Sequence, residues 1–146
     1  MSARSTSRPA TLDLGLLLLR FAVGGTLVAH GLQKLLVFTL PGVAGSFAGM
    51  GIPLPEVVAP AVAAIELIGG SLIVLGIGTR VAGLLAAAAM LGAVFTAHAG
   101  AGYFATDGGF ELPLLIACAA VALALTGPGR LSVHTALLRG RAPLAA

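Results

Sequence analysis

The chain has 146 residues, of which 58% are hydrophobic and 9% are charged, and its mean hydropathy is +1.08. This composition excludes an ordinary soluble globular domain and predicts an integral membrane protein with no room for a separate soluble domain. The net charge is +3. The basic residues are spread over tails and loops without forming a basic face, so nucleic acid is not expected as a partner.

Four apolar runs predict an all-α integral membrane four-helix bundle, because a helix needs about 20 apolar residues to cross the hydrocarbon layer. In chain order, the expected spans are about residues 13–38, 56–76, 81–100 and 110–126, between a tail at 1–12 and a second tail at 127–146.

The start of the first span resembles a signal peptide, since Arg4 and Arg8 precede an apolar run. Arg20 interrupts that run and no clear small-x-small cleavage site follows, so a retained first span is expected. Thr11 or Asp13 is expected to cap this helix.

The connection between the first two expected spans, residues 41–55, combines three prolines with an oily set of side chains that includes Val43 and Phe47. This mixture predicts a short interfacial helix or a re-entrant turn rather than a free loop.

Basic residues fall on one side of a four-span arrangement, and Lys34 is the only one near the other side. This bias predicts a protein of the cytoplasmic (inner) membrane with both tails in the cytoplasm. The residues that establish it are Arg4, Arg8, Arg80, Arg130, Arg139 and Arg141.

Three polar residues share one face of the first span. Arg20 and Lys34 are two heptads apart, and His30 lies one turn before Lys34. Gly24 and Gly31 lie close to the same face and are expected to let a neighbouring helix approach closely. This face should therefore look into the bundle.

Glu66 lies about ten residues into the second span and must be protonated or paired there. A structural ion pair between Arg20 and Glu66 is expected, with Lys34 and His30 as competing partners. Such a pair can serve a redox or transport site, or it can simply fix the order of the helices.

His30, Lys34, Glu66 and His98 are predicted to form a polar pocket in the outer half of the bundle, with Glu111 beside them. Two imidazoles, an ammonium and a carboxylate suit proton-coupled chemistry or hydrogen bonds to a quinone carbonyl. In the alternative interpretation, Lys34 is a snorkelling anchor, and His98 and Glu111 belong to the interface near a loop.

Other cofactors find little support in the sequence. His30 and His98 sit at similar depth on two helices, as haem ligands would, but no c-type attachment motif is present. They also lack a third soft ligand for zinc or copper, so no metal site is predicted. Cys118 is the single cysteine, which leaves neither a disulfide nor a CxxC pair.

The chain resembles the DoxX family of small four-helix membrane proteins over about residues 14–132. The resemblance implies a four-span protein of the cytoplasmic membrane, in a family linked to thiosulfate:quinone oxidoreduction and to membrane redox complexes. It is carried by Leu18-Leu19-Arg20, Gly24, His30-Gly31-Leu32-Gln33-Lys34, Glu66, Gly69-Gly70, Gly76, Thr79-Arg80 and Gly127-Pro128-Gly129-Arg130-Leu131-Ser132.

The resemblance carries over Arg20, His30, Lys34 and Glu66 as polar positions of the family, without assigning their roles. At His134 the family often has an acidic residue, so no role is carried over to that position.

These features favour a subunit of a quinone-linked membrane redox assembly, at most an oxidoreductase subunit, with membrane or peripheral redox proteins as partners. Two alternatives stay open: a small proton-coupled transporter that uses Glu66, and an assembly or structural factor with no ligand. A homo-oligomer in the lipid bilayer is compatible with each of them.

Overall fold

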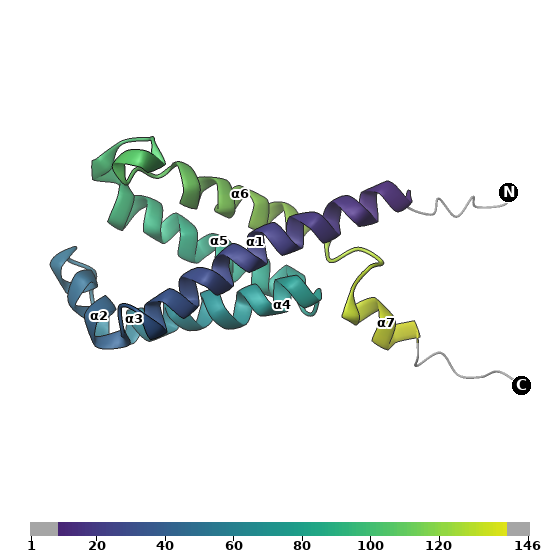
Figure 1. The fold of residues 1–146 in the computed structure, drawn as a ribbon, viewed down its shortest axis with the longest axis horizontal. Coiled ribbons are helices and arrows are strands. Elements are labelled where there is room, and N and C mark those ends of the chain that lie inside the picture. The colour runs from purple at the N-terminus through teal and green to yellow at the C-terminus, as the bar shows by residue number, and fades with distance from the viewer. Residues whose placement is uncertain (1–8, 140–146) are drawn as a thin grey trace, which may run out of the picture.

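The computed structural model describes residues 9–139, and every regular element within them is helical, which confirms the all-α fold (Figure 1). Four long helical segments run alternately up and down. They are α1 (Ala10–Leu36); α3 (Pro55–Ala64) continued by the π-helical turn η1 (Ile65–Gly69) and α4 (Gly70–Leu75); α5 (Thr79–Ala93) continued by a second π-helical turn, η2 (Val94–His98); and α6 (Glu111–Thr126). The short helices are α2 (Leu40–Gly49), η3 (Ala99–Ala101), η4 (Ala105–Asp107) and α7 (Val133–Arg139).

Within residues 9–139, three segments are long and apolar enough to cross a membrane: Ala10–Leu36, Pro55–Leu75 and Thr79–Ala101. The fourth, α6, has 16 residues. At 1.5 Å per residue it is about 24 Å long, shorter than the roughly 30 Å of a hydrocarbon layer. It completes the bundle by packing along α5.

The observed ends of the first helix differ from the expected ones. α1 begins at Ala10 after Pro9, and neither Thr11 nor Asp13 caps it. It ends at Leu36, because Thr39 then takes a positive φ of 61° and starts α2. Of the two expected tails, residues 1–8 and 140–146 lie outside the described residues.

The oily connection after α1 contains the short helix α2. Its side chains Val43, Ala44 and Phe47 pack against Ala59 of α3. The Thr39 hydroxyl accepts a hydrogen bond from the Gly42 backbone N–H at 3.4 Å and so caps the helix. The expected short helix is therefore present.

α1 crosses η1 and α4 almost backbone to backbone. A Cβ added at Gly24 would lie 2.6 Å from the Gly70 carbonyl oxygen, and one added at Gly31 would lie 2.7 Å from the Leu67 nitrogen. The expected close approach at Gly24 and Gly31 is confirmed. It fixes the register, so that Glu66 lies beside the last turns of α1.

Two π-helical turns interrupt otherwise regular spans. η1 follows Pro60, which has no N–H to donate within its helix, and it carries Glu66. η2 ends at His98. Insertions of this kind re-aim the side chains that follow and occur often at functional sites, and here each turn carries one of the predicted pocket residues.

The close crossing generates the first prediction. Gly24→Ala should lower the free energy of unfolding by about 1–3 kcal/mol, because its methyl group would overlap the backbone of Gly70. Gly25→Ala is the matched control: nothing lies within 4 Å of its added Cβ, and alanine is the better helix former by up to about 1 kcal/mol. Thermal unfolding in detergent measures both, and equal melting temperatures would contradict the backbone-contact model.

Candidate functional site

The only lysine of the chain, Lys34, pairs with Glu66 inside the bundle. Its Nζ lies 2.8 Å from Glu66 Oε1 and 2.7 Å from Oε2, and the two side chains are 18% and 3% exposed. Each charge alone would be costly in a membrane interior, and together they form a neutral unit. The observed partner of Glu66 is therefore Lys34, one of the two competing partners that the sequence analysis named.

The expected Arg20–Glu66 pair is wrong, and the register of the helices explains why. Gly24 lies opposite Gly70, and Gly31 lies opposite Leu67. Glu66 consequently falls next to the turn that carries Lys34, while Arg20 lies at the other end of α1.

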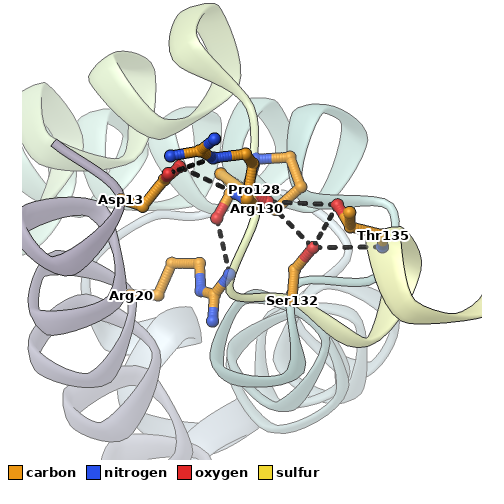
Figure 2. Close-up of polar contacts among 7 residues, drawn as sticks. Asp13, Arg20, Pro128, Arg130, Ser132 and Thr135 are labelled. Carbon is orange, nitrogen blue, oxygen red and sulfur yellow. Dashed lines mark hydrogen bonds and ion pairs between the residues drawn. The ribbon is translucent and has the colours of Figure 1, made fainter. Parts of the chain in front are cut away.

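Arg20 instead holds the segment that follows α6 (Figure 2). It donates hydrogen bonds from Nη1 to the Pro128 carbonyl oxygen at 2.6 Å and from Nη2 to the Leu131 carbonyl oxygen at 2.7 Å, although its residue is only 2% exposed. Its Nε has no hydrogen-bond partner within residues 9–139. Hydrogen bonds to charged groups are the stronger class, so this contact is a firm tie.

Asp13 reinforces the same tie from a position about two turns earlier on α1. Its carboxylate accepts hydrogen bonds from the Arg130 backbone N–H at 2.9 Å and from Arg130 Nε at 2.5 Å. Ser132 and Thr135 then link the segment to the start of α7. We call this set, Asp13, Arg20, Pro128, Arg130 and Leu131, the terminal clamp.

Sequence reasoning interpreted residues 127–129 as a helix stop and missed the clamp. A usable signal was present, because Asp13 and Arg20 are one heptad apart and share a face of α1. The partners of Arg20 are backbone carbonyls, which no side-chain pattern reveals.

At the opposite end of the bundle the structure has a cavity of about 190 Å³. All four predicted pocket residues line it: His30 and Lys34 from α1, Glu66 from η1, and His98 from η2. The remaining wall is mostly apolar and consists of Met90, Ala93, Ala105, Gly108, Gly109, Leu112, Pro113 and Ile116.

His98 is half-buried and anchored to the loop above it. Its Nδ1 lies 2.6 Å from the Gly108 carbonyl oxygen. His30 is also half-buried, and the described part of the chain offers it no hydrogen-bond partner. The two imidazoles therefore differ, since one is oriented by the backbone and the other is held by packing alone.

Glu111 does not line the cavity, in contrast to the expected gathering of polar residues. Its Oε2 accepts a hydrogen bond from the Ala105 backbone N–H at 3.0 Å and so ties down the loop before α6. Tyr103 in that loop packs edge-on against Phe104 and Phe110. Glu111 therefore shapes the rim of the cavity from outside.

Two further expectations concern metal sites and the cysteine. Within residues 9–139 no three His, Cys, Asp or Glu side chains lie close enough together to hold a metal ion. Cys118 is exposed on the outer surface of α6.

The fold and the cavity define a class: a small helical membrane protein with four polar side chains in a mostly apolar cavity at one end of its bundle. The DoxX family model matches residues 15–99, and the chain belongs to the DoxX family. A Bacillus subtilis (strain 168) protein named "Putative oxidoreductase CatD" is 35% identical over 130 residues, which cover 88% of this chain and 91% of that protein. No solved structure matches.

The ion pair generates the second prediction. Lys34→Met should lower the free energy of unfolding by about 3–5 kcal/mol, because it leaves the buried carboxylate of Glu66 without its partner. The double variant with Glu66→Gln should regain part of this loss. Glu56→Gln, at an exposed carboxylate, is the control and should change little. Denaturant unfolding in detergent measures these variants together with the wild type and Glu66→Gln alone, and additive losses from Lys34→Met and Glu66→Gln would argue against a direct pair.

The terminal clamp generates the third prediction. Arg20→Met should speed tryptic cleavage after Arg130 by at least about tenfold. Each lost hydrogen bond to a charged group destabilises the clamped conformation by roughly 1.5–3 kcal/mol, so trypsin reaches Arg130 more often. Thr26→Ala, which removes only a bond to Ala22 of the same helix, is the control. Timed digestion followed by mass spectrometry gives the rate, and equal rates in the two variants would rule out the clamp.

Proposed function

We propose that this DoxX-family protein is a subunit of a quinone-linked redox assembly in the cytoplasmic membrane, and that its cavity holds the quinone headgroup. One observation carries the proposal: a buried ion pair and two imidazoles converge on a small cavity that is otherwise apolar. Few convergent polar groups on an apolar wall are the usual make-up of a small-molecule site.

The residues present fit a quinone. Lys34 gives two of its three N–H groups to Glu66 and keeps one as a donor for a ring oxygen. His30 is a second polar group that makes no hydrogen bond within the described chain. Met90, Pro113 and Ile116 provide the apolar surface for the faces of the ring. A bound quinone would supply two-electron redox chemistry at this position.

The size of the cavity suits a headgroup rather than a whole molecule. At about 190 Å³ it is smaller than the roughly 300–1,000 Å³ of sites for drug-sized ligands. Its wall reaches the surface at the exposed residues Ala105, Gly108 and Leu112. An isoprenoid tail would leave at this edge and lie in lipid.

Two features support placing the cavity near one membrane interface. Tyr103 and Phe104, both exposed in the loop before α6, have the character of interfacial aromatic anchors. Arg80 and Arg130 lie at the opposite end of the bundle, where Figure 1 also shows the start of α1 and the short helix α7. By the positive-inside rule this end is cytoplasmic in our proposal, and the cavity faces the outer leaflet.

The redox role is proposed on the name of one relative. The name of the Bacillus subtilis relative contains the word oxidoreductase. The single cysteine of this chain leaves no CxxC pair for thiol chemistry, so in this proposal electrons reach or leave the quinone through a membrane or peripheral partner protein.

Copurification of quinone tests the proposal and is the fourth prediction. The protein is extracted in mild detergent, and its bound lipids are quantified by mass spectrometry together with a reduced-minus-oxidised optical spectrum. We expect about one quinone per protein, lost in His30→Ala and Glu66→Gln and kept in Glu56→Gln. His30→Ala is informative because it removes no hydrogen bond within the described chain.

Quinone at the same level in all variants, or in none of them including the wild type, would contradict the proposal. Substrate-dependent proton movement in vesicles without bound quinone would favour the transporter alternative. Normal folding with neither property would favour an assembly factor.

A further inference from the structure

The contact between His98 and Gly108 fixes where the imidazole carries its proton. The Nδ1–O distance is 2.6 Å. A carbonyl oxygen can only accept a hydrogen bond, so Nδ1 must carry hydrogen. In the neutral ring Nε2 then has a free lone pair and acts as an acceptor.

The loop keeps this carbonyl in place. Gly108 has a positive φ of 82° at the end of η4, a conformation that glycine adopts readily. The backbone N–H groups of the two residues that follow it are engaged as well: Gly109 donates to the Phe104 carbonyl at 2.9 Å, and Phe110 donates to the Gly102 carbonyl at 3.0 Å. The tautomer of His98 is therefore set by the backbone of a braced loop.

The cavity consequently presents a hydrogen-bond donor on one wall and an acceptor on another. Lys34 offers its remaining N–H as a donor on the side of α1. His98 offers a lone pair as an acceptor on the side of η2. A ligand that satisfies both needs an acceptor toward Lys34 and an O–H donor toward His98.

We infer that His98 makes the cavity selective for the reduced form of its ligand, so that a quinol binds more tightly than the corresponding quinone. This inference rests on the proposed function and adds a specificity-determining residue to it. A quinol hydroxyl donates to His98 Nε2, and its other oxygen accepts from Lys34. A quinone carbonyl would set its lone pairs against that of Nε2 and leave both without a partner, which is unfavourable in a buried site.

Two substitutions separate the acceptor from the contact with Gly108. In His98→Asn the amide N–H can replace Nδ1–H toward the Gly108 carbonyl, while the acceptor at the Nε2 position is lost. In His98→Gln the amide group reaches the Nε2 position and can turn to donate or to accept. The first variant should lose the preference by weakening quinol binding, and the second should lose it by accommodating both forms.

The experiment measures binding of a short-tailed benzoquinol and its quinone to the full-length protein in nanodiscs by anaerobic calorimetry. For the wild type we expect the quinol to bind roughly five- to tenfold more tightly, the effect of one net hydrogen bond. In His98→Asn quinol affinity should fall to the level of the quinone, with quinone affinity changed less than about twofold. The circular dichroism of Tyr103, the only tyrosine, reports whether the loop is intact.

Equal affinities of the wild type for the two forms would overturn the inference and leave the proposed function standing. A quinol preference that survives in both His98 variants would also overturn it, because the preference would then come from another group. If neither form binds to the wild type, the proposed function itself fails. Should His98→Asn not fold, loss of the preference in His98→Gln decides the question.

Discussion

The ion pair between Lys34 and Glu66 is the interaction on which the cavity end of the bundle depends. The Glu66 side chain is only 3% exposed and that of Lys34 18%, so the carboxylate in particular has almost no water to stabilise it without its partner. The pair forms because Gly31 lets α1 touch the backbone of η1 at Leu67, which leaves the ammonium and the carboxylate at hydrogen-bonding distance. Without the glycine contact the helices would separate by the width of a side chain, and without the pair the carboxylate would have to be neutral. Packing and electrostatics therefore support each other at one place.

The first helix links the two ends of the molecule. At one end Asp13 and Arg20 hold the segment after α6, and at the other end Lys34 meets Glu66. The clamp fixes the last turn of α6, while Glu111 and the aromatic contacts of Tyr103 brace the loop before its first turn. α6 is short for a membrane span, and it is tied at both ends. Its residues Pro113 and Ile116, which form part of the cavity wall, are thereby kept in register with α1 and η1.

The sequence was sufficient for the fold class and for the members of the pocket, but not for their pairing. Composition and apolar run length predicted the helical bundle, and the small residues Gly24 and Gly31 predicted the close crossing. Arg20 was assigned the wrong partner because the prediction compared only the depths of Arg20 and Glu66 along the membrane normal. The pairing depends on the register of two crossing helices, which only the backbone contacts at Gly70 and Leu67 set. The bonds from Arg20 and His98 end on carbonyl oxygens, and every residue has one, so no residue pattern could identify them. The π-helical turns at Glu66 and His98 share no residue pattern either, since Pro60 precedes the first and α5, which precedes the second, contains no proline.

The central claim is the direct contact between Lys34 and Glu66, and solid-state NMR in lipid bilayers can measure it. Because Lys34 is the only lysine, ¹⁵N labelling of lysine side chains gives one ammonium signal. Dipolar recoupling to ¹³C-labelled glutamate carboxyl groups then reports their distance, with Glu66→Gln removing the expected partner. We predict strong dephasing of the Lys34 signal, consistent with N–O distances of 2.7 and 2.8 Å, and its loss in the variant. No dephasing in the wild type, or dephasing that persists without Glu66, would contradict this account of the site.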